Sequence, residues 1–349
     1  MGGGGGRLGR TEAERRVRMA TRLSDVAARA GVSVKTVSNV INDYPHITAR
    51  TREKVEAAIA ALGYRPNVSA RSLRKGRSDF IALALPEMGS PYFAELGAEI
   101  SRAAKRRGIT VLIDQTEGEP AAEQLVLDGM RGQLIDGIIF SPLATAPAKL
   151  TSADTGKPLV LLGERPAGGQ FDRVAVDSVQ ASYDATTHLV SLGRHRIAAI
   201  GVGGTSTGAV RRKGYRKALK DAGLPHDPAL ELAGTGYHRP DGAASMRELL
   251  ALPEPPDAVF CFNDLLALGA LRTLADAGLR VPDDVAVVGF DDIEDGRYHS
   301  PTLTTISPDK EWLADNAVAL LLDRIAGNDD THRDLTVPYT LEIRESTAG

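Results

Sequence analysis

Two short segments with helical spacing of small apolar residues, joined by one glycine, constrain the fold of residues 23–41. Ser24 can cap the first helix, and Gly31 then offers the positive φ that a tight turn between helices requires. Ser33 can cap the second helix, in which the apolar residues form one stripe. The sequence therefore predicts a helix, a tight turn and a second helix.

The other face of the second helix carries side chains that can read DNA bases. Its outward or flanking residues are Val34, Lys35, Ser38, Asn39 and Asn42. Lysine can donate to guanine, asparagine can pair with adenine through two hydrogen bonds, and valine can contact a thymine methyl group. These residue types favour a helix-turn-helix in a DNA groove, and an ordinary surface hairpin is the alternative.

The net charge of −3 hides two oppositely charged parts. Residues 1–78 carry 16 Lys and Arg against 6 Asp and Glu, whereas residues 79–349 carry 26 against 39. A basic module attracts phosphate and an acidic body is repelled by it, so DNA binding should weaken steeply with salt.

A third helix and a short basic stretch follow. Thr48 can cap a helix over residues 49–62, which Gly63 can end. Residues 67–77 are too short and too basic to be stably helical alone, so we expect them to order only on DNA. Leu73 within them suits an apolar wedge at a minor-groove base step, and a bare linker is the alternative.

At this point the chain resembles the lactose/galactose-repressor (LacI/GalR) family of transcriptional regulators. The motifs that carry the resemblance begin at Asp25-Val-Ala, Thr51-Arg-Glu-Lys-Val, Gly63-Tyr-x-Pro-Asn and Ala70-Arg-Ser-Leu. The resemblance implies base-reading positions at Val34, Lys35 and Asn39. It implies phosphate-proximal positions at Ser33, Thr36, Ser38, Asn42 and His46, and a DNA-binding hinge with Ala70 and Leu73. It also implies a homodimer on a near-palindromic double-stranded operator.

The body is long enough for two core-bearing lobes. Apolar runs typical of strands buried on both faces begin at Phe80, Thr110, Gly137, Pro158, Ile197, Ala258 and Val285. Amphipathic stretches separate several of them, which predicts parallel sheets with helices on both sides. Ligands of such folds bind beyond the carboxyl ends of the strands.

Aromatic and polar side chains follow these runs and suit a polyol or a planar base. Strand-end caps and turns are the alternative for each of them. The body also resembles periplasmic sugar-binding proteins through Gly278-Leu-Arg-Val-Pro-Asp-Asp and Pro301-Thr-Leu-Thr-Thr-Ile. The resemblance implies effector contacts from Phe93, Arg211, Tyr237, Asn263 and Asp291. Gly163 stands where some sugar-responsive members have an aspartate, and the adjacent Glu164 can substitute.

The predicted fold is an all-α helix-turn-helix domain followed by a periplasmic-binding-protein-like α/β body of two parallel-sheet lobes. We expect a disordered tail over 1–20, the helix-turn-helix domain over 21–66, and a hinge helix and linker over 67–78. Effector binding and dimerisation fall to 79–349, with lobes of 79–176 plus 308–337 and 177–307 plus 338–349. A ligand between the lobes would alter operator affinity, and the coupling must be reciprocal.

Other classes of protein lack support in the sequence. The glycine-rich run from Gly201 has Ser206 where a dinucleotide loop needs its third glycine, and no nucleophile elbow or phosphate-binding Gly-Lys-Ser/Thr occurs. The seven histidines lack metal spacing, and Cys261, the single cysteine, lies in a strand-like run. We therefore expect no enzyme activity, no cofactor and no metal.

The predicted function is a repressor of sugar uptake or catabolism genes. We expect it to be cytoplasmic, because no signal-like or transmembrane-length segment is found. The effector is expected to be a sugar that releases the operator. A regulator that answers a purine or other non-sugar metabolite is the alternative, and a sugar-binding transport protein fits less well. The chain end lacks leucine heptads, which favours a dimer over a tetramer.

Overall fold

The computed structural model describes residues 21–64, 77–129, 135–145, 156–164, 169–203, 206–234, 236–328 and 330–348. The chain divides after Ser78 into two compact units. In the first unit, three helices surround a small core in which Val26, Val37 and Val55 are fully buried. These helices are α1 (Leu23–Ala30), α2 (Val34–Ile41) and α3 (Ala49–Leu62).

The predicted caps of this unit are confirmed for two helices and wrong for one. Ser33 accepts a hydrogen bond from the Thr36 amide at 3.0 Å, and Thr48 caps α3 in the same way. Gly31 has a φ of 65°, as the turn prediction requires. Ser24, however, lies inside α1, because the helix begins at Leu23, two residues earlier than a Ser24 cap would place it. Arg22 is the N-cap, and its amide donates to the Asp25 carboxylate at 2.8 Å.

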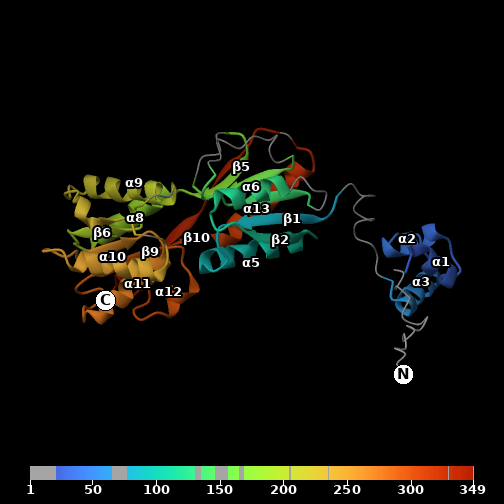
Figure 1. Ribbon diagram of the computed structural model, residues 1–349, viewed down its shortest axis with the longest axis horizontal. Helices are drawn as coiled ribbons and strands as arrows, with labels where there is room; N and C mark the ends of the chain where they lie inside the picture. The colour runs from blue at the N-terminus through green and yellow to red at the C-terminus, as the bar shows by residue number, and fades with distance from the viewer. Residues whose placement is uncertain are drawn as a thin grey trace, which may run out of the picture. The chain divides into compact units, whose positions relative to one another are not determined.

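The second unit contains two six-stranded sheets (Figure 1). The sheet of the first lobe has the order β11 (Asp334–Val337), β5 (Asp172–Val176), β4 (Leu159–Leu162), β3 (Gly137–Phe140), β1 (Phe80–Leu85), β2 (Thr110–Gln115). The sheet of the second lobe has the order β12 (Tyr339–Glu342), β10 (Thr304–Pro308), β9 (Ala286–Phe290), β8 (Ala258–Cys261), β6 (Ile197–Ile200), β7 (Glu231–Leu232). Neighbouring strands are parallel, except that β10 and β12 are antiparallel. The predicted fold class is confirmed.

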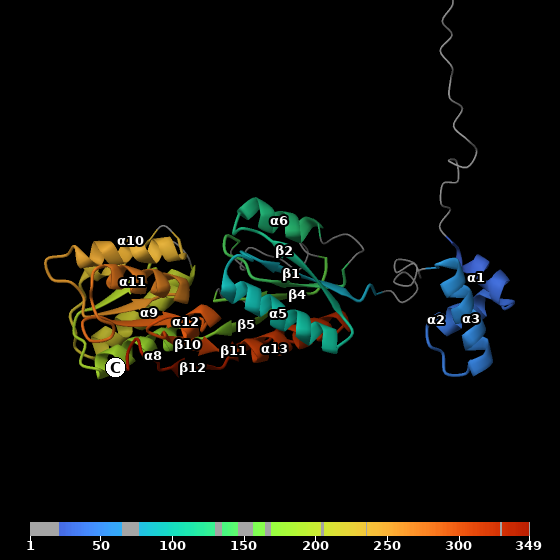
Figure 2. The same cartoon turned by 90° about the horizontal axis from the view of Figure 1, so that it is seen from below.

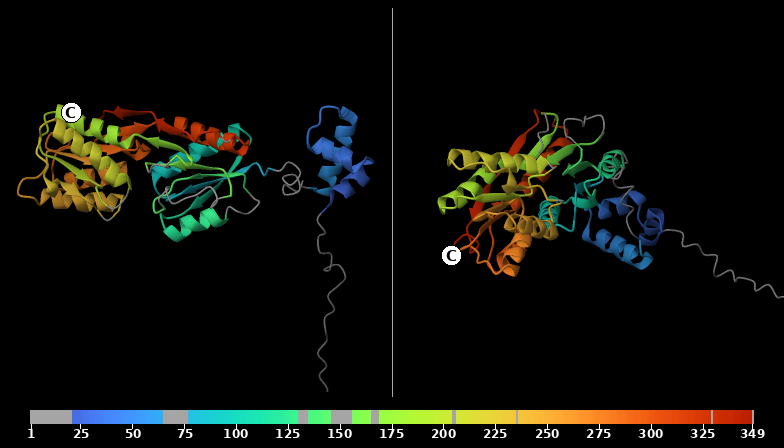
Figure 3. Two further views of the ribbon diagram at one scale, coloured as in Figure 1. Left: turned by 90° about the horizontal axis from the view of Figure 1, so that it is seen from above. Right: turned by 60° about the vertical axis from the view of Figure 1, so that its left-hand side comes forward.

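Helices cover both faces of each sheet (Figure 3). Those of the first lobe are α5 (Pro91–Arg106), α6 (Pro120–Gly129) and α13 (Lys310–Ile325). Those of the second lobe are α8 (Ser178–Ser191), α9 (Ser206–Asp221), α10 (Arg239–Leu250), α11 (Asp264–Asp276), α12 (Glu294–Tyr298) and the 3-10 helix Pro228–Leu230. Each sheet separates two hydrophobic clusters. Of the described helices, not one has the length and hydrophobicity needed to cross a bilayer.

The predicted burial of strand β2 is wrong. The other predicted strands are buried, whereas Leu112 and Ile113 on β2 are 46% and 44% exposed. β2 is an edge strand: among the described strands it pairs with β1 alone, and no other described strand lies on its outer side. An apolar run alone does not distinguish a central strand from an edge strand that another molecule covers.

The chain passes between the lobes at three points, which lie close together (Figure 2). β5 leads into α8, β10 leads into α13, and β11 leads into β12. The register of the sheets pairs Val176 with Val337 and Pro308 with Tyr339, so the crossing segments are neighbours. Side chains at the carboxyl ends of the strands of both lobes can therefore meet near these crossings.

Candidate DNA-reading helix and effector cavity

Helix α2 presents most of the predicted DNA contacts to solvent. Val34 is 47% exposed, Lys35 is exposed and Asn39 is half-buried. Ser33, Asn42 and His46 are exposed and Thr36 is half-buried. Ala70 and Leu73 lie outside the described residues.

Ser38, which was predicted to lie outward or at the flank of this face, is only 9% exposed. It lies between the buried Val37 and Val40, and its carbonyl oxygen accepts a hydrogen bond from Nδ2 of Asn42 at 2.7 Å. Helical spacing places Ser38 at the margin of the apolar stripe, and in the structure it is buried with that stripe. Its predicted proximity to a phosphate stays a prediction.

A cavity of about 210 Å³ lies in the second unit and is lined by residues of both lobes. All five predicted effector residues line it: Phe93, Arg211, Tyr237, Asn263 and Asp291. They come from α5, α9, the segment before α10, the cap of α11 and the end of β9. The five side chains therefore lie around one cavity, and their role in ligand binding stays a prediction.

Arg211 is the central charge of the cavity. Its Nε and Nη2 donate to Oε1 of Glu164 at 3.2 and 3.1 Å, and Nη1 donates to the Phe262 carbonyl. The guanidinium carbon lies 3.4 Å from the centre of the Phe290 ring, which is a cation–π contact. Burial alone would lower the pKa of Arg211, but the carboxylates of Glu164 and Asp291 raise it. The side chain therefore remains charged.

Glu164 supplies the carboxylate of the first lobe. Gly163 has a φ of 102°, a backbone conformation that would be strained for an aspartate at this position. The following residue, Glu164, lines the cavity. Ser178 and Arg211 both donate to Oε1 of Glu164. Oε2 is buried and has no hydrogen-bond partner among the residues that the structure describes. Glu164 lines the cavity, and its Oε2 is an acceptor whose hydrogen-bonding capacity the described residues leave unused.

Asp291 supplies the carboxylate of the second lobe. Its Oδ1 lies 4.0 Å from Nη1 of Arg211. Burial raises the pKa of Asp291 to about 7, with Arg211 and Lys310 opposing the rise and Glu164 reinforcing it. Near neutral pH this group can both accept and donate hydrogen bonds, according to its protonation.

Asn263 and Tyr237 are partly committed to the protein itself. Oδ1 of Asn263 caps α11 by accepting from the Leu266 amide at 2.9 Å, and its Nδ2 donates to the Tyr237 carbonyl at 3.0 Å. The Tyr237 hydroxyl donates to the Gly201 carbonyl at 2.6 Å. These two residues therefore have the cap and turn roles that were the alternative prediction. They also line the cavity, where ligand contacts are predicted.

The cavity also contains aromatic residues that sequence reasoning did not select. Tyr92 lies against Phe93, with ring centroids 5.2 Å apart in an edge-to-face arrangement, and Phe290 lies under Arg211. Both residues stand directly beside a predicted one in the sequence. Burial raises the pKa of Tyr92, so its phenol stays protonated. Their position beside predicted residues was visible in the sequence. The sequence alone could not show that the consecutive residues Tyr92 and Phe93 of α5 both line the cavity.

Comparison with known proteins reveals similarity over nearly the whole chain. Residues 22–67 match the family model described as bacterial regulatory proteins, lacI family, and residues 186–347 match a periplasmic binding protein-like domain. The HTH-type transcriptional repressor PurR of Mannheimia succiniciproducens is 34% identical over 331 residues, which are 94% of this chain and 98% of that protein.

Two solved structures extend the comparison. The lac repressor dimer bound to operator and the anti-inducer ONPF is 30% identical, with a TM-score of 0.82 over 94% of this chain and 99% of that one. The complex of the transcriptional regulator CelR with cellobiose is 33% identical, with a TM-score of 0.70 over 93% and 99%.

Removal of the central cation should destabilise the body. We expect Arg211→Met to lower the free energy of unfolding by about 3 kcal/mol, because two buried carboxylates lose their counter-charge. Urea unfolding followed by the fluorescence of Trp312, the only tryptophan, reports on this unit. The double variant Arg211→Met/Glu164→Gln should recover part of the loss. A double variant less stable than the single one would contradict this account.

Proposed function

Because this chain belongs to the LacI family of bacterial regulatory proteins, we propose that it is a cytoplasmic repressor that releases a near-palindromic operator when a small sugar binds. Like its relatives, it is a DNA-binding transcriptional repressor and not an enzyme. The observation that carries the effector proposal is the convergence of five predicted side chains from separate segments on one cavity.

Sequence-specific DNA binding is assigned to helix α2. Val34 and Lys35 lie exposed at its beginning, and Asn39 lies about one turn further along it. The side chains of this face can donate to guanine, pair with adenine and contact thymine methyl groups. Phosphate attraction comes from the basic composition of residues 1–78.

Selection of bound duplexes from a random DNA library should yield two related half-sites in inverted orientation. On the selected duplex, we expect Lys35→Ala to weaken binding about tenfold or more, because a base contact is worth ~1–3 kcal/mol. Lys54→Ala, which removes an exposed lysine of α3, is the matched control and should have a smaller effect. Two results would contradict base reading by Lys35. One is that both variants lose the same affinity for the selected duplex. The other is that Lys35→Ala loses as much affinity for unrelated DNA as for the selected duplex.

A single-ring sugar suits the cavity for three reasons. The carboxylates of Glu164 and Asp291 can accept hydrogen bonds from a ligand, and Oε2 of Glu164 has no donor among the described residues. Sugar hydroxyls can donate these hydrogen bonds. The ring of Phe93 offers a surface for the apolar face of a sugar. The cavity, at about 210 Å³, is smaller than the ~300–1,000 Å³ typical of sites for drug-sized ligands. The relative solved with cellobiose also supports a carbohydrate.

A purine is the second candidate. Heterocyclic N–H groups can also donate to Glu164 and Asp291, and planar rings stack on the same aromatic side chains. The relatives named PurR are the reason to include this class in the test.

Thermal unfolding against glucose, galactose, ribose, cellobiose, adenine and guanine tests the effector class. A monosaccharide at a hundredfold excess over its Kd should stabilise the native state by ~2.7 kcal/mol. Glu164→Gln should reduce the shift, whereas Glu248→Gln, at an exposed position on α10, should leave it unchanged. A shift with purines alone would replace the sugar by the second candidate, and the same compound should then release the selected operator.

We also propose that the protein is a homodimer whose interface includes the outer side of β2. This edge strand exposes Leu112 and Ile113, and a second copy related by two-fold symmetry would cover them. A dimer would also present two copies of α2 to the two halves of an operator.

Sedimentation equilibrium should give twice the chain mass of 37.0 kDa for the unaltered protein. Ile113→Asp should reduce it to the monomer mass, because the substitution places a charge in an apolar interface. Leu192→Asp, at a residue 42% exposed after α8, is the control and should remain dimeric. A monomeric parent protein, or a dimeric Ile113→Asp variant, would contradict this interface.

A further inference from the structure

The turn that carries Asp291 is strained. Asp291 and Asp292 have φ values of 116° and 48°, and they are adjacent non-glycine residues in the left-handed region. Such a backbone conformation is unfavourable for a residue with a side chain and persists only when its surroundings hold it. The position of the Asp291 carboxylate in the cavity therefore depends on whatever holds this turn.

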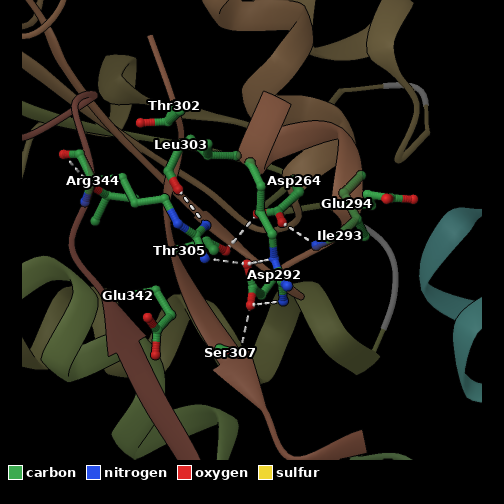
Figure 4. Close-up of polar contacts among 12 residues, drawn as sticks. Asp264, Asp292, Ile293, Glu294, Thr302, Leu303, Thr305, Ser307, Glu342 and Arg344 are labelled. Carbon is green, nitrogen blue, oxygen red and sulfur yellow. Dashed lines mark hydrogen bonds and ion pairs between the residues drawn. The ribbon is translucent and has the colours of Figure 1, made fainter. Parts of the chain in front are cut away.

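The Asp292 carboxylate is the main anchor of the turn (Figure 4). It is 3% exposed and is not among the residues that line the cavity. Oδ1 accepts from Nη2 of Arg344 at 2.7 Å, while Oδ2 accepts from Ser307 at 2.8 Å and from Arg297 at 2.6 Å. Burial alone would raise the pKa of Asp292, but the hydrogen bonds from Arg297, Arg344 and Ser307 hold it below its ordinary value.

A second anchor lies on the other side of the turn. Asp264 is 1% exposed and accepts from the Ile293 amide at 2.9 Å and from Oγ1 of Thr305 at 2.6 Å (Figure 4). The Asp291 amide donates to the Ile306 carbonyl at 2.9 Å. The turn is thus tied to β10 on both sides, and Asp292 provides its charged contact.

Arg344 is itself fixed in place although it lies near the end of the chain. Its Nη1 donates to the Leu303 carbonyl at 2.8 Å, and its amide donates to Oγ1 of Thr304 at 2.8 Å. Its side chain is 18% exposed, whereas that of Arg297, the other cation on Asp292, is 54% exposed. Arg344 is therefore the better shielded of the two contacts.

We propose that Asp292, held by Arg344, is the positioning residue that fixes the Asp291 carboxylate in the effector cavity. The C-terminal segment that follows β12 thereby becomes part of the effector site without touching the ligand. This inference rests on the proposed role of Asp291 in effector binding.

The test is a carboxyl ¹³C NMR titration of the full-length protein without ligand, with Asp291 assigned through Asp291→Asn. In Arg344→Met, we expect the pKa of Asp291 to fall from about 7 toward the ~3.9 of a solvated aspartate, because a relaxed turn admits water. Simple loss of a cation would raise this pKa. The sign therefore separates repositioning from a direct charge effect, and the charged groups facing Asp291, namely Arg211, Lys310, Glu164 and Glu95, stay unchanged.

Arg216→Met is the matched control, because it also removes an arginine from a carboxylate, Glu231, that is 5% exposed in the same lobe. It should leave the Asp291 titration unchanged. Ser307→Ala, which removes one donor to Asp292, is the milder second variant and should lower the pKa less. Amide exchange of residues 290–293 should accelerate about tenfold or more in Arg344→Met.

An Asp291 pKa that is unchanged or raised in both Arg344→Met and Ser307→Ala, with unchanged exchange, would overturn the proposal. Neither measurement uses an effector. A failure of the sugar proposal would therefore leave this test intact, and a failure here would not affect the ligand panel.

Discussion

The body depends on one buried ion pair that joins its two lobes. Arg211 belongs to α9 in the second lobe, whereas Glu164 follows β4 in the first, and the two side chains are 9% and 8% exposed. Breaking such a pair leaves uncompensated buried charge, which is far more costly than losing a surface ion pair. The same contact therefore links the two lobes and places a charge in the cavity. A ligand that enters here must preserve this contact or replace it.

The same contact leaves the cavity short of hydrogen-bond donors. Oε1 of Glu164 accepts from Arg211 and Ser178, but the described part of the chain gives the buried Oε2 no partner, and such an unsatisfied group costs of the order of 1–3 kcal/mol. A ligand that donates to Glu164 and Asp291 together would bridge the lobes, because the two carboxylates belong to different sheets. Such a ligand favours whichever lobe orientation allows both bonds, and its effect on the operator follows from that difference in affinity.

Local chemistry in the sequence predicted much of this structure. The bounds of α3 and of β1, β3 and β6 agree with the sequence patterns, and the five strand-end side chains line one cavity. The failures have tertiary causes. Helix α1 begins at Leu23 with Arg22 as its N-cap, so Ser24 lies inside it; Ser38 is buried together with Val37 and Val40; and the edge position of β2 leaves its apolar run exposed. Glu164 was recognised only as a substitute beside Gly163, because a positive φ and an unpartnered oxygen are visible only in three dimensions.

The support of Asp291 lies further still from any sequence pattern. Asp292 and Arg344 are 52 residues apart, and the network between them also includes Ser307 at the end of β10, where the chain crosses to the first lobe. Lys310, the first residue of α13 beyond that crossing, donates to the Asp292 carbonyl at 3.1 Å and pairs with Glu95 of the first lobe. A ligand that bonds to Asp291 would therefore interact with a turn that is hydrogen-bonded to a segment crossing between the lobes. The residues that tune effector response should accordingly extend beyond the cavity, to side chains that hold this turn and never contact the effector.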